Sequence, residues 1–197
     1  MDLAEAGQAI AHLVVGAAGN LSVRDGDAML ITPRGTRLDR VGESVRVRLS
    51  DGAVLEGHGP SSETPLHRAV YAATDAQAIV HTHSRFATVM STLVSELPPV
   101  HYVTTAFGGC VRVAPYATFG SEELAANVAT ALVGRRAALL ANHGAVTIGE
   151  NLDQAVDLAL QLEWLAEVAY YATLGGRPAM LGEPDLDAVV EQARALA

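Results

Sequence analysis

Short apolar runs alternate with longer amphipathic segments along the chain. Runs of four or five residues rich in Val, Ile and Leu, bounded by turns that contain Gly or Asp, predict strands. We expect such strands at residues 21–24, 29–32, 45–49 and 53–56, within 78–84 and 108–116, and on both sides of a turn in residues 137–149.

The amphipathic segments predict helices, and several of them have recognisable ends. Ser121, followed by two glutamates, is typical of a helix start, and Gly134 is typical of a helix end. Asn151 with Gln154 predicts a capping box. We expect helices at residues 3–15, from Ser61 or Ser62 to residue 74, and at residues 84–93, 121–134 and 151–175.

The alternation of strands and helices indicates an α/β protein. A chain of 197 residues is long enough for one sizeable core, and no repeat, low-complexity tract or linker divides it. We therefore expect a single domain over residues 1–197.

Composition and charge narrow the possible partners. The formal net charge of −9 and the lack of a basic stripe argue against a nucleic-acid-binding surface. No apolar run is long enough to cross a bilayer, and the acidic start lacks the basic region of a signal peptide. The lone cysteine, Cys110, excludes a disulfide within the chain and fits a reducing compartment. We expect a cytoplasmic protein that binds neither nucleic acid nor membrane.

The segment AIVHTHS, residues 78–84, places two histidines at the end of an apolar strand. Alternate side chains of a strand point to the same face, so His81 and His83 project together while Thr82 points away. Two imidazoles on one face can converge on a single metal ion. Alone, the pair is explained equally well by one capping and one solvated histidine.

A third imidazole comes from ANHGAV, where His143 lies in a tight turn after an apolar run. Catalytic zinc commonly takes three protein ligands and keeps a position for water or substrate. His81, His83 and His143, with a carboxylate nearby, would form such a site. The remaining histidines fit no ligand pattern, and we expect packing or surface positions for His12 and His67, a solvated His58 and an unassigned His101.

Three turns rich in small and polar residues can surround an anion with backbone donors: AAGN (17–20), TPRG (32–35) and GPSSE (59–63). Ser61 and Ser62 lie where a helix is expected to begin, near its free N–H groups and positive dipole end. Ordinary turns and an ordinary helix cap explain each feature as well.

A series of motifs covers residues 16–176: GNLSVR, ITPRG, GPSSETPLHRAVY, IVHTHS, PPVHYVTTAFGG, APYATFG, LLANHGAV and LALQLEWLAEVAYYATLGG. In this order they resemble the class II aldolase/adducin family, and most closely its L-fuculose-phosphate aldolase branch. The resemblance implies an α/β/α sandwich with a mainly antiparallel central sheet. It also implies a homotetramer with active sites at subunit interfaces, and one divalent metal ion per subunit, Zn²⁺ or another ion such as Mn²⁺ or Co²⁺.

The resemblance further implies roles for individual residues. The matches to the metal ligands are His81, His83, His143 and Glu63. Glu63 also matches the catalytic base, and Tyr102 matches a catalytic tyrosine that reaches the site of a neighbouring subunit. The residues in the turns that match the phosphate pocket are Gly19, Asn20, Arg34, Gly35, Ser61 and Ser62.

Two features of the sequence depart from the family pattern. Arg34 stands where these aldolases usually have a small Ser or Thr, and it either adds a charge-assisted phosphate contact or crowds the pocket. No tyrosine follows Tyr171, whereas the fuculose-phosphate enzymes have a functional tyrosine in a mobile C-terminal tail.

The implied reaction is the reversible cleavage of a short ketose 1-phosphate, L-fuculose 1-phosphate-like or a deoxyketose phosphate, into dihydroxyacetone phosphate and an aldehyde. A zinc ion would stabilise the enediolate as a Lewis acid, and Glu63 would shuttle the C3 proton. The alternatives are a pentulose-phosphate 4-epimerase, a dehydratase or a decarboxylase of the same family, since ETPLHRAVY and VHTHSR also resemble the epimerase branch. A non-catalytic, adducin-like interaction module is disfavoured because the three histidines are intact.

Overall fold

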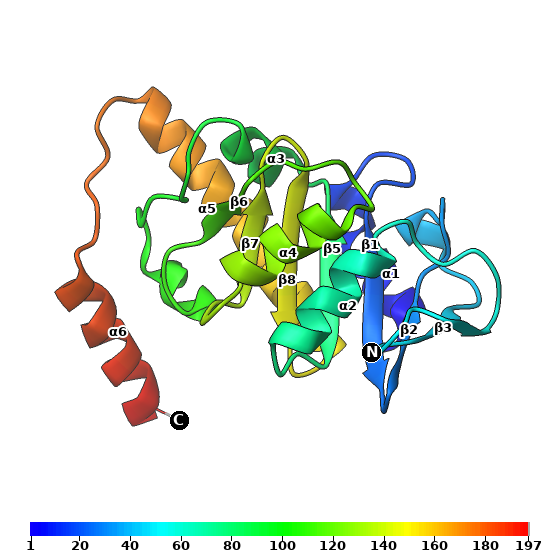
Figure 1. The fold of residues 1–197 in the computed structure, drawn as a ribbon. Helices are drawn as coiled ribbons and strands as arrows, with labels where there is room; N and C mark the ends of the chain where they lie inside the picture. The colour runs from blue at the N-terminus through cyan, green and yellow to red at the C-terminus, as the bar shows by residue number, and fades with distance from the viewer. Residues whose placement is uncertain (197) are drawn as a thin grey trace.

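The expected alternation of strands and helices is present in the computed structural model, which describes residues 1–196 (Figure 1). The strands are β1 (Asn20–Asp25), β2 (Ala28–Ile31), β3 (Val45–Arg48), β4 (Val54–Glu56), β5 (Ala78–Thr82), β6 (Arg112–Ala114), β7 (Ala137–Leu140) and β8 (Gly144–Gly149). The helices are α1 (Leu3–Ile10), α2 (Thr64–Ala73), α3 (Arg85–Ser91), α4 (Glu122–Ala131), α5 (Leu152–Leu174) and α6 (Glu183–Leu196). Short 3-10 helices are η1 (Ala11–Leu13), η2 (Leu38–Arg40) and η3 (Tyr102–Phe107).

These strands form one sheet in the order β4-β3-β2-β1-β5-β8-β7-β6. Every neighbouring pair is antiparallel except β6 and β7. Antiparallel neighbours can be joined by tight turns, and Gly26, with a φ of 61°, lies in the two-residue link between β1 and β2. The mainly antiparallel sheet expected from the sequence is therefore confirmed.

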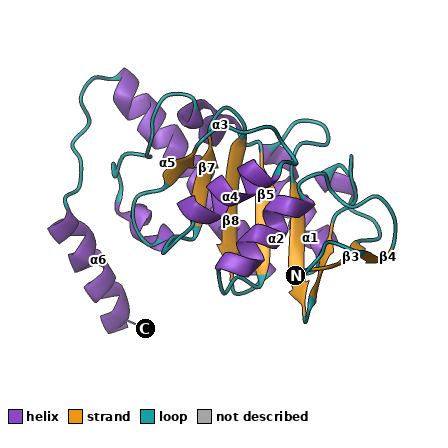
Figure 2. Cartoon of the chain, viewed as in Figure 1, coloured by secondary structure: helices purple, strands orange, loops and turns teal. Residues whose placement is uncertain are grey.

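Helices cover both faces of the central strands (Figure 2). On one face α2 and α4 pack together, and Val70 and Val128 join a hydrophobic cluster with Ile79. On the other face, where α1, α3 and α5 lie, Val80 packs in a cluster with Val156. All five residues of β5 are buried because alternate side chains enter opposite cores. The expected α/β/α sandwich is confirmed, with β5 in its middle layer.

The start of α2 differs from the sequence expectation. The helix begins at Thr64, not at Ser61 or Ser62. The Ser61 hydroxyl accepts a hydrogen bond from the backbone N–H of Glu63 at 3.2 Å, and the Ser61 carbonyl accepts one from Thr64. Ser61 therefore closes a turn just before the helix instead of capping its first turn, and this turn sets the position of Glu63.

Other helix ends follow the sequence closely. The Ser121 side chain accepts from the N–H of Leu124, as a helix cap does. The Asn151 side chain accepts from the N–H of Gln154, but the Gln154 side chain accepts from Glu150. The predicted capping box is thus right in its first half and wrong in its second, because the glutamine reaches one residue further back.

The two ends of the chain were less well anticipated. The first helix stops at Ile10 and continues as η1 to Leu13, short of the expected residue 15. The helix α6 was not expected; it follows an extended segment, has no buried residue and contacts η3 (Figure 1). No helix within residues 1–196 combines the length and the apolar character needed to cross a membrane.

Candidate metal centre

Two neighbouring strands bring together the three histidines that the sequence singled out. His81 lies near the end of β5 and is fully buried, and His83 follows directly after the strand. β8 runs antiparallel to β5, with Thr82 paired to Ala145, so the turn before β8 meets the end of β5. That turn contains His143. The ring centroids of the three histidines are 4.7 to 5.0 Å apart.

A close approach of two backbones makes this meeting possible. A Cβ at Gly144 would collide with the carbonyl oxygen of Thr82 and crowd the ring of His83. Asn142 has a φ of 56°, a left-handed conformation that asparagine tolerates better than most residues. The small residue and the left-handed turn together let His143 lie beside the end of β5.

The donor atoms of the cluster fit a metal ion. The ligand atoms of His81, His83 and His143 all lie within 4.8 Å of one another. His81 Nδ1 is 3.0 Å from the carbonyl oxygen of Ala145, which can only accept, so the ring hydrogen is on Nδ1. His81 Nε2 therefore presents a lone pair, and it lies 3.0 Å from His83 Nε2. Two nitrogens bound to one tetrahedral zinc ion lie about 3.3 Å apart, since each Zn–N bond is about 2.0–2.1 Å.

The electrostatic environment keeps these imidazoles neutral. Burial and the two neighbouring rings lower the pKa of His81 well below its ordinary value, and burial lowers the pKa of His83. Burial, with a smaller effect of His83, lowers the pKa of His143 to about 4. Only a neutral imidazole can bind a metal through its lone pair. At neutral pH the cluster thus presents metal-binding forms of all three side chains.

A cavity of about 270 Å³ opens onto the cluster. We call it the site cavity; its lining residues are Ala17, Ala18, Gly19, Asn20, Ser62, Glu63, His81, His83, Tyr116, Ala117, Phe119, Asn142 and His143. Of the predicted phosphate-binding residues, Gly19, Asn20 and Ser62 are therefore in the cavity wall. Ser61 is buried directly behind, bonded to the backbone of Glu63.

Glu63 is a buried carboxylate with spare hydrogen-bonding capacity. Only 4% of its surface is exposed. Its Oε1 accepts from the N–H of Gly120 at 3.1 Å, whereas Oε2 has no partner among the described residues. Burial raises the pKa of this carboxyl. Its oxygens are not among the atoms that meet within 4.8 Å in the histidine cluster, so its metal-binding role stays a prediction while its place in the cavity wall is established.

Arg34 and Gly35 lie outside the site cavity. They form the exposed turn after β2, and the N–H of Arg34 donates to the carbonyl of Gly59. An isolated bridge between Pro33 and Pro60 joins this turn to the one that leads to Ser61. The two turns predicted to bind phosphate are thus side by side, but Arg34 and Gly35 do not line the site cavity.

Tyr102 also lies apart from the cavity. It opens η3, is 57% exposed, and stacks on His101 with 4.3 Å between ring centroids. Trp164 in α5 lies nearly perpendicular to His101, with 4.8 Å between ring centroids. Within one chain Tyr102 is therefore part of an exposed aromatic group, and its predicted position in a neighbouring subunit's site stays a prediction.

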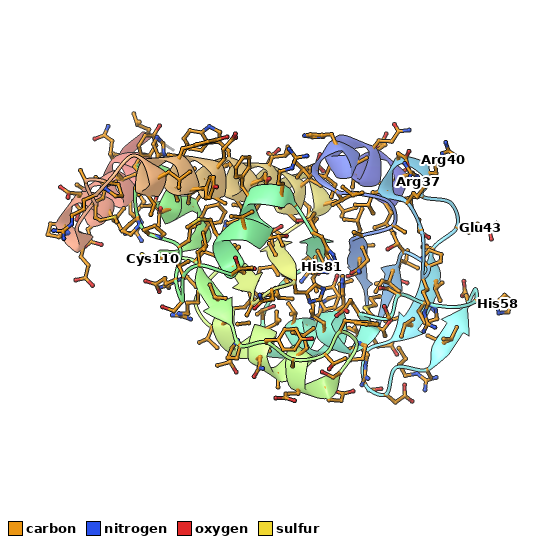
Figure 3. All side chains as sticks on the ribbon, turned by 90° about the horizontal axis from the view of Figure 1, so that it is seen from above. Arg37, Arg40, Glu43, His58, His81 and Cys110 are labelled. Atoms are coloured by element: carbon orange, nitrogen blue, oxygen red, sulfur yellow. The ribbon has the colours of Figure 1, made fainter. Side chains whose placement is uncertain are left out.

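The remaining histidines differ sharply in their surroundings. His58 is exposed at the outer edge of the molecule, well apart from the buried His81 (Figure 3). His12 is exposed on η1 and borders a second cavity of about 500 Å³, which His83 and His143 also border. Both fit the surface positions expected for them.

His67 was missed as a residue of interest. It is fully buried, and both its ring nitrogens bond to polar side chains of β1: Nε2 to Asn20 and Nδ1 to Ser22. A signal was present in the sequence, because Asn20 and Ser22 alternate on one strand face while His67 and Tyr71 are four residues apart on a helix. Tyr116 and Phe119, which line the cavity from the segment after β6, were also not singled out.

Comparisons with known proteins agree with this geometry. The family model for the Class II Aldolase and Adducin N-terminal domain matches residues 1–170. An L-fuculose phosphate aldolase of Escherichia coli (strain K12) is 44% identical over 162 residues, which are 81% of this chain and 75% of that protein. A 5-methylthioribulose-1-phosphate/5-deoxyribulose-1-phosphate aldolase of Rhodospirillum rubrum is 37% identical over 186 residues, 90% of this chain and 81% of that protein.

A solved structure of an L-fuculose 1-phosphate aldolase superposes with a TM-score of 0.92. The match has 37% sequence identity and covers 98% of this chain and 94% of that one. The histidine cluster, the fold and these matches lead to one conclusion: the chain belongs to the Class II Aldolase and Adducin N-terminal domain family, and its similarity to aldolases supports an aldolase activity.

Proposed function

We propose that the chain is a metal-dependent aldolase acting on a short ketose 1-phosphate. The substrate would be L-fuculose 1-phosphate-like or a deoxyketose phosphate, cleaved reversibly into dihydroxyacetone phosphate and an aldehyde. The observation that carries the proposal is the convergence of three neutral imidazoles on a cavity that also contains a buried carboxylate and polar donors. A metal site, an acid–base group and an anion pocket are the three parts that this cleavage needs.

His81, His83 and His143 would hold one divalent ion per subunit, Zn²⁺ or another ion such as Mn²⁺ or Co²⁺. When bound, such an ion acts as a Lewis acid that polarises a carbonyl group and offsets negative charge developing on its oxygen. The carbonyl of Ala145 supports this site by fixing the hydrogen of His81 on Nδ1, so that Nε2 faces the other rings.

Glu63 would move the proton at C3. In the cleavage direction the bond between C3 and C4 breaks, the C4 hydroxyl loses its proton to a base, and its electron pair forms the aldehyde. C3 must then gain a proton to give dihydroxyacetone phosphate, and in the reverse direction it must lose one. The unpartnered Oε2 and the raised pKa of Glu63 suit a group that alternates between the two forms.

The polar wall formed by Gly19, Asn20 and Ser62 would bind the phosphate, together with Ser61. Arg34 and Gly35 would contribute from the adjoining turn, which the bridge between Pro33 and Pro60 holds beside Ser61. Binding energy at the phosphate fixes the position of the reacting carbons without contacting them. Tyr102 of a neighbouring subunit would accept the C4 hydroxyl proton in a homotetramer with sites at its interfaces. The exposure of Tyr102 leaves its hydroxyl accessible to another chain.

A panel of sugar phosphates tests this proposal. The metal-loaded protein is incubated with L-fuculose 1-phosphate, 5-deoxyribulose 1-phosphate, a pentulose 5-phosphate and a 3-oxo-tetronate 4-phosphate, and the products are identified. Release of dihydroxyacetone phosphate with an aldehyde is expected, and Glu63→Gln should abolish most of it. Epimerised sugar, dehydrated product or CO₂ would instead identify an epimerase, a dehydratase or a decarboxylase. No turnover of any compound by metal-loaded protein would favour an interaction module.

A further inference from the structure

A hydrogen-bonded series of four buried polar side chains, which we call the polar relay, ends at the site cavity. Asn20 lines the cavity, and its Oδ1 lies 2.6 Å from His67 Nε2. His67 Nδ1 lies 2.6 Å from the Ser22 hydroxyl, which lies 2.8 Å from the Tyr71 hydroxyl. None of the four is more than 6% exposed. Away from its cavity end, this polar relay is sealed from water.

The polar relay forms because β1 and α2 each place two polar side chains on the face that meets the other element. Asn20 and Ser22 are two residues apart on β1, so their side chains share a face of the sheet. His67 and Tyr71 are four residues apart on α2, so they lie one turn apart on the same side of the helix. Hydrogen bonds join the two faces: His67 bonds to Asn20 and Ser22, and Tyr71 bonds to Ser22.

The direction of the hydrogen bonds follows from Tyr71. Burial raises the pKa of its hydroxyl, so the proton stays on the oxygen, and within residues 1–196 the Ser22 oxygen is its hydrogen-bond partner. A buried hydroxyl that failed to donate would cost free energy. Tyr71 therefore donates to Ser22, and the Ser22 hydroxyl in turn donates to His67 Nδ1.

His67 passes this direction on to Asn20. Burial lowers the pKa of His67 to about 3, so the ring is neutral and carries one hydrogen. With Nδ1 accepting from Ser22, that hydrogen is on Nε2 and is donated to the Asn20 Oδ1. The amide oxygen is thereby turned inward, and the NH₂ group of Asn20 remains for the cavity.

We propose that His67 is a positioning residue that holds the Asn20 amide with its two N–H donors toward the site cavity, where they bind the substrate's phosphate. The inference rests on the proposed function. A freely rotating amide would present its oxygen lone pairs to the anion for part of the time, which weakens binding. His67 touches neither substrate nor metal; it acts through Asn20.

The first test is spectroscopic and independent of any reaction. In the ¹⁵N spectrum of the folded protein, His67 should show a protonated Nε2 and an unprotonated Nδ1 at neutral pH. The opposite tautomer would overturn the proposal, because Nε2 would then accept from Asn20 and turn its amide oxygen toward the cavity.

The second test uses inorganic phosphate as the probe, with binding measured by calorimetry on the metal-loaded protein. His67→Leu should weaken phosphate binding about 10-fold or more, as expected when a hydrogen bond to a charged group is lost. In turnover it should raise KM in proportion and change kcat little. His67→Gln retains an N–H donor and should restore most of the affinity. Val70→Ala is the matched control, because Val70 is a fully buried residue of α2 outside the polar relay. It should lower thermal stability without changing phosphate affinity.

A double-mutant cycle shows whether His67 acts through Asn20. Asn20→Ala alone should weaken phosphate binding, and adding His67→Leu should weaken it no further. Independent, additive effects, or unchanged phosphate affinity in folded His67→Leu, would overturn the proposal. If His67→Leu does not fold, Tyr71→Phe replaces it: a weakening of a few-fold supports the proposal and unchanged binding overturns it. Because phosphate binding is measured without turnover, a protein that cleaves none of the sugar phosphates would refute the proposed function and leave this inference testable.

Discussion

His67 and the histidine cluster at the site cavity are both held neutral in this fold, yet their ring nitrogens have opposite surroundings. His67 has a hydrogen-bond partner at each ring nitrogen and is sealed inside the sandwich. In the cluster of His81, His83 and His143, ring nitrogens point at one another beside an open cavity. Burial lowers the pKa in both groups. Low pKa alone therefore does not mark a metal site; what distinguishes the cluster is that one ligand atom from each of the three rings lies within 4.8 Å of the other two.

Removing one member of the cluster should have the largest effect on activity. His83→Ala leaves two ligands, and the loss of Lewis-acid assistance should lower kcat/KM by about 10³-fold or more. His83 is partly exposed, so the fold should survive the change. Steady-state kinetics with the best sugar phosphate, with circular dichroism as the folding control, measures this. Turnover within tenfold of the parent would mean that the cluster is not part of the active site.

The carboxylate beside the cluster should come next. Glu63→Gln keeps the shape and the contact with Gly120 but cannot accept a proton, so kcat should fall by about 10²–10⁴-fold. Phosphate affinity should change little, because the polar donors of the cavity wall are intact. Near-normal turnover would leave Glu63 as a buried structural carboxylate and require another base.

Tyr102 tests whether the site is completed by a second chain. Tyr102→Phe and His83→Ala proteins should each be poorly active as pure oligomers. After both are unfolded together and reassembled, roughly a quarter of the sites should combine an intact metal centre with an intact Tyr102, if each site draws on two chains. Activity above either parent is the expected result. A monomer in solution, or mixed oligomers without recovery, would place Tyr102 outside a shared site.

The smallest effect concerns stability and pH, and it comes from the other side of the comparison. The pKa of His67 is 6.5 ordinarily and about 3 in the fold, so between these values the unfolded chain binds a proton that the native one does not. The contribution of the His67 titration to the free energy of unfolding is fully present above pH 6.5. It should fall by about 1.4 kcal/mol per pH unit as pH decreases toward 3.

Urea unfolding of the metal-free protein at pH 7, 6 and 5 measures this slope. The cluster histidines add a slope of the same sign, so the informative quantity is the difference between the parent and His67→Leu. We expect the variant to show the weaker pH dependence over this range. Equal slopes in the two proteins would mean that His67 is not held neutral by burial.

Much of the metal centre could be predicted because its signals are local. Alternation along a strand puts His81 and His83 on one side, and the glycine after His143 marks a tight turn. The meeting of the two segments depends on β5 and β8 being antiparallel neighbours, and the sequence analysis did not predict this pairing.

The polar relay from Tyr71 to Asn20 could not be predicted in the same way. Asn20 and His67 are 47 residues apart, and their contact depends on how α2 lies relative to β1. The spacing places His67 and Tyr71 on one helix face and Asn20 and Ser22 on one strand face, but no local pattern predicts that these two faces meet.

The helix α6 was missed although Leu186, Val189 and Val190 lie on one face at helical spacing. None of its side chains is fully buried, so the stripe has no partner in the core.

Metal binding by three proteins tests the central distinction most directly. The parent, His83→Ala and His67→Gln are each stripped with a chelator, reloaded with Zn²⁺, desalted, and assayed for metal per chain. The parent and His67→Gln should retain one ion per chain, and His83→Ala should retain little or none. Full occupancy in His83→Ala, or loss of metal in folded His67→Gln, would contradict the account.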